Sequence, residues 1–445
     1  MKLPTDIYEI MDRLNGYGYE AFLVGGAVRN ILLNLEVKDY DITTNAKPSE
    51  LVGLFKKTIL TGVRFGTVTV VINSRSYEIT TYRRDYEYLD SRRPSVVRFS
   101  DELEEDLTRR DFTINAICMD KEGNVIDPLN GMEDINNRII RAIGNPDTRF
   151  KEDALRMMRA IRLMSEIEFT IDENTLSSIT ANASSISYIS AERIQNELNK
   201  ILLSRKPSLG LFKMMETGML GTIIPEIIPC VGFQQFSSYH DQDVFSHTMI
   251  VLDNTSPKLE IRLAALFHDI DKPNCLTIDE NGEGHFYGHH IESARISKEV
   301  LKRLKYSNDV IEKVYRLIRY HPLKEINIGD KGVKRFINKV GKDNLEDMFN
   351  LNYADIMGKS TYKGIAKLKN MEERTQQIIN RHEPLNLKDL EIKGKDIKEL
   401  GIHEGPLIGE ILDRLMTLVF DNPEDNNREK LIQYVKEMMK ENPLD

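Results

Sequence analysis

The spacing of hydrophobic positions along the chain changes near residue 145. Before that point, a helical spacing over residues 4–15 is followed by apolar and β-branched runs in AFLVGG, TVTVVI and SYEITTY, which are typical of strands. After it, apolar residues recur three and four positions apart in EDALRMMRAIRLMSEI, AERIQNELNKILL and KLEIRLAALFHDI. The pattern predicts an α+β fold, with a mixed domain over residues 1–145 and an all-helical remainder.

Composition and charge narrow the class of protein. The 445 residues are 40% hydrophobic and 29% charged, and no run of about 18 apolar residues predicts a membrane span. The acidic first residues do not resemble a signal peptide, and the three cysteines lack the close pairing of zinc or redox motifs. We therefore expect a cytoplasmic protein. The net charge of −9 argues against indiscriminate nucleic-acid binding, but it is compatible with a local basic groove.

The stretch VGGAVRNILLNLEVKDYDI contains two features that suit phosphate chemistry. Gly25 and Gly26 lie between a predicted strand and a predicted helix, where backbone amides can approach a phosphate and Arg29 adds a guanidinium. If KDYDI is a strand, Asp39 and Asp41 point to one face, because side chains alternate along a strand. Paired carboxylates suit Mg²⁺, so the order fits a nucleoside triphosphate beside a two-metal centre. A tight turn followed by a surface Asp-x-Asp is the alternative.

Five segments together resemble one family. GGAVRN with DYDI, TGVRFGTVTV, EITTYRRDYEYLDSRRPSVVRF, DLTRRDFTINAI and RFKEDALRMMRAIRL look like the class II nucleotidyltransferases, which are CCA-adding enzymes and bacterial poly(A) polymerases. The resemblance implies a polymerase-β-like catalytic head over residues 1–145, with Mg²⁺ held by Asp39 and Asp41. It also implies a helical neck over residues 146–230 that selects the nucleotide.

The selecting segment can be examined through its hydrogen-bonding chemistry. Asp153 and Arg156 are three residues apart, which predicts one shared helical face. Cytosine and adenine each present an amine beside an acceptor nitrogen, so a carboxylate next to a guanidinium matches them and mismatches uracil and guanine. Such a pair can reject UTP and GTP without a template. Arg159 and Arg162 follow at three-residue steps and are candidates for contacts with triphosphate or RNA, with a solvated basic face as the alternative.

The resemblance assigns further residues of the head. Arg110, Asp111 and Asn115 correspond to contacts with the triphosphate and ribose, whereas Asp106 at the start of the same motif is a candidate for a structural role. Residues 83–98 lack clear periodicity and correspond to the flexible loop that CCA-adding and A-adding members keep.

One further carboxylate belongs to this group. Glu78 begins EITTYR on a predicted strand and is a candidate for a third metal carboxylate or for a contact behind the metal ligands.

A second group of candidate ligands follows in the helical part. His247, the adjacent pair His268 and Asp269, His289 and His321 resemble the motifs of an HD domain, a helical metal-dependent phosphohydrolase fold. This resemblance implies a metal site for a transition metal or Mg²⁺ within residues 231–370, with His289 and His321 as the weaker candidates, and structural histidines are the alternative.

The HD resemblance has one departure. Pro322 follows His321 where some members have an aspartate, and Asp355 is a candidate replacement that spacing alone does not establish.

The last segment, residues 371–445, resembles the tail of these enzymes. Gly394 and Gly405 precede predicted helices, and Lys393 and Lys395 add positive charge that suits RNA phosphates, although simple helix caps explain the glycines equally well. We therefore expect a helical RNA-binding tail.

The motifs taken together predict a CCA-adding tRNA nucleotidyltransferase. Its partners would be tRNA, CTP and ATP, with pyrophosphate released and no membrane involved. A poly(A) polymerase and an A-adding enzyme share the same motifs and remain alternatives. Two alternatives of other classes are an HD-type phosphohydrolase acting on RNA ends and a noncatalytic RNA-binding module, which would not need a metal pair.

Overall fold

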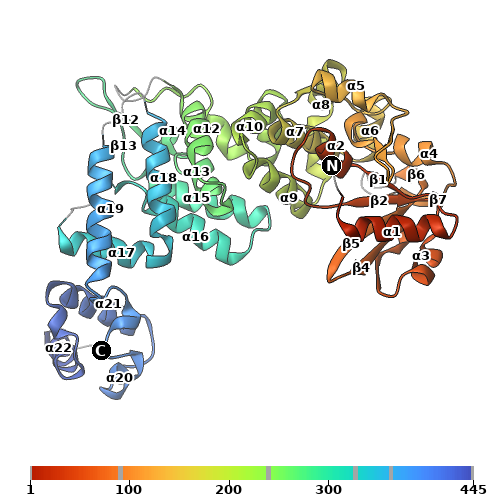
Figure 1. The fold of residues 1–445 in the computed structure, drawn as a ribbon. Helices are drawn as coiled ribbons and strands as arrows, with labels where there is room; N and C mark the ends of the chain where they lie inside the picture. Colours follow the sequence, from red (N-terminus) through yellow and green to blue (C-terminus); the bar gives the residue numbers. More distant parts are fainter. Residues whose placement is uncertain (1–2, 89–93, 237–241, 324–328, 360–363, 442–445) are drawn as a thin grey trace. The chain divides into compact units, whose positions relative to one another are not determined.

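The chain folds into two compact units, Met1–Pro225 and Glu226–Asp445 (Figure 1). The structure is a computed structural model that describes residues 3–88, 94–236, 242–323, 329–359 and 364–441. The predicted α+β class is confirmed, because one mixed sheet forms in the first unit and helices dominate everything after it.

The first unit is built on a seven-stranded mixed sheet in the order β3-β4-β5-β2-β1-β8-β9. Strands β2 and β5 are parallel, and the other neighbours are antiparallel. The strands and the helices that accompany them are α1 (Thr5–Gly16), β1 (Phe22–Val24), α2 (Gly26–Leu32), β2 (Asp41–Thr44), α3 (Pro48–Leu54), β3 (Thr58–Gly62), β4 (Thr67–Ile72), β5 (Arg75–Thr81), α4 (Leu103–Thr108), β8 (Cys118–Met119), β9 (Val125–Ile126) and α5 (Gly131–Asn137).

The central strands follow the alternation of their sequences. Val68 and Val70 of β4 are buried, as are Tyr77 and Ile79 of β5, while the residues between them are less buried. Alternation of this kind places apolar side chains on one face of the sheet. The strands predicted from TVTVVI and SYEITTY are therefore confirmed.

The segment predicted as a loop over residues 83–98 is mostly a hairpin. Strand β6 (Arg83–Tyr88) pairs antiparallel with β7 (Pro94–Phe99), and Arg83 lies opposite Phe99. The prediction was wrong because backbone hydrogen bonds between the two arms form the hairpin. Such pairing does not require a regular alternation of apolar and polar side chains. Residues 89–93 lie outside the described residues.

Helices complete the first unit after residue 145. They are α6 (Pro146–Glu152), α7 (Leu155–Ile167), α8 (Glu173–Asn182), α9 (Ala191–Leu202), α10 (Pro207–Glu216) and α11 (Met219–Ile223), with β10 (Ile139–Ile140) and β11 (Thr170–Ile171) forming a short parallel pair. Helix α6 starts where the Asn145 side chain accepts a hydrogen bond from the Thr148 backbone amide. Ala154, Met158 and Ile161 are buried, as their helical spacing indicates.

The second unit is helical apart from one small hairpin. Its elements are α12 (Val244–Asn254), α13 (Leu259–Phe267), α14 (Lys272–Cys275), β12 (Leu276–Ile278), β13 (Gly284–Phe286), α15 (His289–Arg303), α16 (Asn308–Arg319), α17 (Asp330–Val340), α18 (Leu345–Met357), α19 (Ile365–Asn380), α20 (Gly394–Glu399), α21 (Pro406–Asp421) and α22 (Arg428–Glu441). Among the described residues, none of the helices has both the length and the apolar character needed to cross a bilayer. Strand β11 and the β12–β13 pair depart from the all-helical structure predicted after residue 145.

Candidate active site and a second cluster of metal-ligating residues

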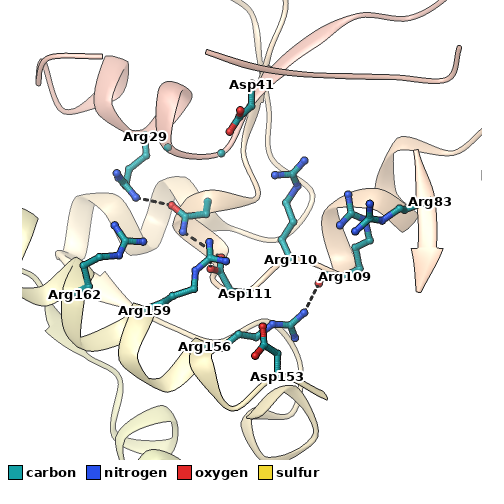
Figure 2. Close-up of a pocket in the computed structure, with 13 residues that line it drawn as sticks. Arg29, Asp41, Arg83, Arg109, Arg110, Asp111, Asp153, Arg156, Arg159 and Arg162 are labelled. Atoms are coloured by element: carbon teal, nitrogen blue, oxygen red, sulfur yellow. Dashed lines mark hydrogen bonds and ion pairs between the residues drawn. The ribbon is translucent and has the colours of Figure 1, made fainter. Parts of the chain in front are cut away.

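A polar cavity of about 360 Å³ opens in the first unit where α2, β2, the end of α4 and the start of α7 meet (Figure 2). It brings together most of the predicted site residues of the head and neck. The lining residues are Gly25, Gly26, Arg29, Asp41, Arg83, Arg109, Arg110, Asp111, Asn115, Asp153, Arg156, Arg159 and Arg162.

Asp41 is the acidic side chain at the sheet side of this cavity. It is the first residue of β2 and lies opposite Glu78 in the parallel register with β5. Asp39 precedes the strand and is exposed, so the expectation that one strand carries both aspartates is wrong. The strand starts later because residues 35–40 form no ladder with a neighbouring strand.

The charge state of Asp41 reflects its surroundings. Asp41 is exposed at the edge of the cavity, but the surrounding protein atoms displace part of the hydration of its carboxyl and raise its pKa; Glu78 and Asp39 raise the pKa further, while Arg110 acts in the opposite direction. Within the described part of the chain, its carboxylate accepts no hydrogen bond. A carboxylate in this state, with two more close by, suits a divalent cation that supplies the missing positive charge.

Gly25 allows the backbone to run close to these groups. Its φ of 75° lies in the left-handed region, and a Cβ atom there would lie 3.6 Å from Arg110 Nη1 and 3.7 Å from Asp41 Oδ2. A side chain at this position would therefore occupy space between the carboxylate and the guanidinium.

Asp106 holds two of the arginines in place. It is fully buried, and its carboxylate accepts hydrogen bonds from Arg109 Nη2 at 2.6 Å, Arg110 Nη2 at 3.0 Å and Thr43 Oγ1 at 3.1 Å. Burial by itself raises the pKa of Asp106, but Arg110 and Arg109 outweigh that effect and hold it below its usual value. The structural role considered for Asp106 fits these contacts.

A chain of hydrogen bonds crosses the floor of the cavity. Arg29 Nη1 donates to Asn115 Oδ1 at 2.7 Å, Asn115 Nδ2 donates to Asp111 Oδ1 at 3.2 Å, and Asp111 Oδ2 lies 2.8 Å from Arg159 Nη2 (Figure 2). Burial raises the pKa of Asp111, but Arg159 and its hydrogen bonds lower it more, so the carboxyl stays ionised. The side chains are thus fixed before any ligand arrives.

The nucleotide-selecting segment differs from the prediction. Helix α6 ends at Glu152, and Asp153 has an extended backbone (φ −151°, ψ 101°) before α7 begins at Leu155. Asp153 and Arg156 therefore do not share a face of one helix. The break has a local cause, since Asp153 Oδ1 accepts the Leu155 backbone amide at 3.1 Å, and aspartate favours such caps over helix interiors.

Both residues nevertheless line the cavity, each with its own support. Arg156 Nη1 donates to Glu152 Oε2 at 2.7 Å, and Arg156 Nη2 donates to the Arg109 carbonyl at 3.1 Å. Asp153 pairs with Arg193 of α9, whose Nη2 lies 2.7 Å from Asp153 Oδ2. The sequence contained no local signal for the second pair, because its partners are forty residues apart.

Arg162 is not on a solvated face. Only 13% of its side chain is exposed, and its guanidinium pairs with Glu166 Oε2 and Glu197 Oε2, each at 2.7 Å. Burial lowers the pKa of Arg162, but the two carboxylates raise it further than burial lowers it, which keeps the side chain charged.

The second unit contains a separate cluster of candidate metal ligands. His247, His268, Asp269 and Asp355 each offer one ligand atom, and these atoms lie within 4.8 Å of one another. Asp269 also belongs to a second such group with His289 and His321. The structure therefore brings together all five predicted residues of the HD-like site, and Asp355, the candidate replacement, joins the group of His247, His268 and Asp269.

The histidine rings of this cluster are oriented by the backbone. The Nδ1 atoms of His247, His268, His289 and His321 lie 3.0, 2.8, 2.7 and 2.8 Å from the carbonyl oxygens of residues 358, 265, 286 and 318. A carbonyl oxygen only accepts, so Nδ1 carries the proton in each ring and Nε2 faces the cluster. This arrangement is the one that usually orients metal-ligating histidines.

Two buried acceptor atoms of the cluster face each other. His268 Nε2 and Asp269 Oδ2 are 3.1 Å apart with no proton between them when His268 Nδ1 carries the ring proton, and Lys272 Nζ lies 2.7 Å from the same Oδ2. His247 Nε2 lies 3.1 Å from Asp355 Oδ1, so an acceptor nitrogen faces an acceptor oxygen unless a cation lies between them. Burial raises the pKa of Asp269, yet His268 and Lys272 hold it well below its usual value. The donor set fits a transition metal or Mg²⁺.

Sequence reasoning missed several supporting groups. Lys272 Nζ lies 2.7 Å from Asp269 Oδ2, and Lys359 Nζ lies 2.5 Å from Asp355 Oδ2. Lys272 follows Asp269 by three residues, and that spacing is a usable signal. His290 is in neither ligand group, although its ring centroid lies 5.6 Å from that of His289.

Seven arginines around an acidic side chain on a mixed sheet suit the transfer of a nucleotide from a triphosphate. Guanidinium groups bind phosphate oxygens, and a carboxylate is the ligand that Mg²⁺ prefers. The fold and the cavity together define a nucleotidyltransferase.

Comparison with known proteins specifies which one. The family profile of the poly A polymerase head domain matches residues 21–141. A profile described as a probable RNA and SrmB-binding site of polymerase A matches residues 168–230, and one for tRNA nucleotidyltransferase domain 2 matches residues 289–435.

Relatives match over almost the whole chain. A CCA-adding enzyme of Geobacillus sp. (strain WCH70) is 35% identical over 430 residues, 96% of this chain and 95% of the relative. One from Limosilactobacillus reuteri (strain DSM 20016) is 33% identical over 97% of this chain and 96% of its own. The crystal structure of the Bacillus stearothermophilus CCA-adding enzyme in complex with CTP superposes with a TM-score of 0.74 at 29% identity, covering 99% of this chain and 98% of that one. The chain belongs to the class II CCA-adding enzymes, the CCA-adding tRNA nucleotidyltransferases.

Proposed function

We propose that the cavity of the first unit carries out the nucleotidyl transfer of this family, with tRNA as acceptor and CTP and ATP as donors. The observation that carries the proposal is the Asp41 carboxylate, which accepts no hydrogen bond from the described residues and lines the same cavity as seven arginines. The tRNA 3′-hydroxyl attacks the α-phosphate of the nucleotide, and pyrophosphate leaves.

Asp41 and Asp39 are the residues that would hold Mg²⁺, with Glu78 next to Asp41 in register on the neighbouring strand. Their fit rests on the raised pKa of Asp41, which comes first from desolvation and then from the nearby carboxylates of Glu78 and Asp39. Bound Mg²⁺ supplies charge neutralisation at the triphosphate and favours ionisation of the attacking hydroxyl. Arg110, held by Asp106, binds phosphate oxygens beside Asp41, and the Gly25 backbone leaves space for them.

Arg29, Asp111, Asn115 and Arg159 form the hydrogen-bonded floor that positions triphosphate and ribose. Their mutual contacts support the roles proposed for them, because a fixed set of donors binds a polyanion without first having to be ordered. Arg162, paired with two glutamates, acts by holding α7 against α9 more than by direct contact.

Base selection rests on Asp153 and Arg156. Both line the cavity, and the carboxylate accepts the exocyclic amine while the guanidinium donates to the ring nitrogen. Uracil and guanine present a carbonyl and an N–H instead, which leaves buried polar groups unpaired. The choice of cytosine or adenine thereby needs no nucleic-acid template.

The first experiment replaces Asp41 by alanine. Transcripts that lack CCA, or that end in CC, are incubated with Mg²⁺ and with CTP, ATP or both, and product lengths are read on a sequencing gel. We expect the unaltered protein to add three nucleotides and stop, and Asp41→Ala to add none while its circular dichroism is unchanged. Asp12→Ala, at an aspartate whose side chain is 57% exposed, is the control.

Two results would contradict this assignment. Near-normal addition by Asp41→Ala would remove Asp41 from the chemistry. Growth of the CC transcript alone, by one adenosine or by a long tail, would indicate the A-adding or the poly(A) polymerase alternative.

A second candidate function is metal binding in the second unit. We propose that Asp269 is shared by two ions, one held with His247, His268 and Asp355 and the other with His289 and His321. The observation that favours it is the 3.1 Å approach of two buried acceptor atoms, His268 Nε2 and Asp269 Oδ2. An open metal position would activate water for hydrolysis of a phosphate ester.

Metal content tests the second proposal without any assay of activity. Protein loaded with Mn²⁺, Ni²⁺ or Zn²⁺ and then dialysed is analysed by mass spectrometry. We expect two ions per chain, one in Asp355→Asn and none in Asp269→Asn, with His285→Ala as a control at a partly exposed histidine outside both groups. Retention of no metal by the unaltered protein would contradict the proposal, and metal without hydrolysis of p-nitrophenyl phosphate would restrict it to binding.

A further inference from the structure

Among the residues that the structure describes, Arg193 is the one partner of the Asp153 side chain that comes from a distant part of the sequence. It lies in the first turn of α9, and its side chain reaches Asp153 with Nη1 3.2 Å from Oδ1 and Nη2 2.7 Å from Oδ2. Two parallel hydrogen bonds of this kind fix both the distance and the plane of a carboxylate. The pair is partly buried, with 23% of the Arg193 side chain and 13% of the Asp153 side chain exposed.

The hydrogen-bond capacity of Asp153 shows what this contact leaves available. An ionised carboxylate has about four acceptor positions, two on each oxygen. Oδ1 uses both of its positions, one for the Leu155 backbone amide and one for Arg193 Nη1. Oδ2 accepts from Arg193 Nη2 alone among the described residues, so one position on Oδ2 stays open toward the cavity.

We propose that Arg193 is a positioning residue for nucleotide selection. It holds the Asp153 carboxylate so that the one open acceptor position can bind only the exocyclic amine of a base. This inference rests on the proposed role of Asp153 in base selection. The guanidinium donates two parallel hydrogen bonds to the carboxylate, so both oxygens face it as acceptors and the carboxylate plane is held. It also prevents the carboxylate from rotating its second oxygen toward the base. A single open acceptor matches the amine of cytosine or adenine and meets the carbonyl of uracil or guanine as an unfavourable contact.

Without Arg193, the same carboxylate would lose its selectivity. Its plane would be free to turn, because only the Leu155 backbone amide would still hold one of its oxygens. The carboxylate could then turn away from the base, and the carbonyl of UTP or GTP would no longer face a fixed acceptor oxygen. Loss of Arg193 therefore differs from a uniform loss of nucleotide affinity. The kcat/KM for UTP and GTP should rise relative to that for CTP and ATP.

The test compares kcat/KM for CTP and UTP on transcripts that lack CCA, and for ATP and GTP on transcripts that end in CC. We expect Arg193→Gln to raise the UTP/CTP and GTP/ATP ratios about tenfold or more, since that is the scale of one unpaired polar group in a selective site. Arg193→Lys keeps the charge but not the two parallel hydrogen bonds, so its ratios should lie between those of Arg193→Gln and the unaltered protein. Arg205→Gln is the matched control, at an arginine just after α9 whose side chain is 82% exposed.

The outcomes separate the inference from the proposal beneath it. If Asp153→Asn changes the ratios and Arg193→Gln lowers only the melting temperature, Arg193 is structural and the inference is overturned. If Asp153→Asn itself leaves the ratios unchanged, the proposed role of Asp153 in base selection is contradicted, and the inference about Arg193 falls with it. If Arg193→Gln does not fold, unchanged ratios in Arg193→Lys with a lowered melting temperature would also overturn the inference.

Discussion

The buried carboxylate of Asp106 gives the sharpest quantitative prediction. Asp106→Asn keeps the size of the side chain but replaces one acceptor oxygen by a donor amide, so Arg109 and Arg110 compete for the remaining oxygen. Removing one partner of a buried ion pair costs about 3–5 kcal/mol. We expect the lower value, about 3 kcal/mol, because 16% and 18% of the two arginine side chains are exposed to water.

This loss is large enough to measure by thermal unfolding. For a unit of this size, about 1 kcal/mol corresponds to about 2–4 °C in Tm, so Asp106→Asn should lower Tm by about 6–12 °C. The chain has no tryptophan, so circular dichroism or calorimetry is the suitable probe. Because each unit can unfold separately, the relevant transition is the one that added CTP shifts upward.

Thr43→Val is the control for the Asp106 prediction. It removes one hydrogen bond to the same carboxylate at 3.1 Å and leaves both arginines paired, so its cost should be about 1 kcal/mol. If Asp106→Asn lowers Tm no more than Thr43→Val does, the carboxylate is not what holds Arg109 and Arg110, and the account of the cavity wall is wrong.

Three further predictions concern backbone space and charge. Gly25→Ala should reduce nucleotide affinity and stability together, by about 1 kcal/mol in stability, because its φ is positive and the new methyl group would lie 3.6 Å from Arg110 Nη1; CTP titration and Tm measure both. The lowered pKa of Asp106 means that the folded state binds its proton more weakly than the unfolded state, so stability is lost as pH falls below about 4, and Asp106→Asn should flatten that loss in urea titrations at pH 3–6. Gly358→Ala would place a Cβ 2.9 Å from the His247 ring and should lower the metal content of the second unit with Tm of the first unit unchanged.

The sequence was sufficient for the α+β class and for most residues of the cavity. Those residues occur in short motifs whose chemistry is local, such as the glycine turn before Arg29 and the arginines around Asp111. The helix break at Asp153 was not predicted, because the apolar spacing of the flanking segments continues across it and only a side-chain cap reveals it.

Contacts between residues far apart in the sequence were not predicted either, because no local motif indicates them. The contact of Arg193 with Asp153 depends on how α9 packs against the segment between α6 and α7, and the residues near either partner in the sequence do not indicate it. Asp355 is an example of what the sequence does not determine. Its spacing made it a candidate ligand, and its Oδ1 atom, 3.1 Å from His247 Nε2, places it among the candidate ligands.

The break between α6 and α7 also restricts which substitutions the chain can accept at residue 153. The carboxylate there caps the Leu155 amide through one oxygen and pairs with Arg193 through both, so local chain geometry and the base selection that we propose for Asp153 depend on the same short side chain. A glutamate would carry the same charge, but its extra methylene would move the carboxylate away from the amide two residues ahead. Because one side chain must both cap the Leu155 amide and pair with Arg193, even a conservative substitution of Asp153 would disturb one of these contacts.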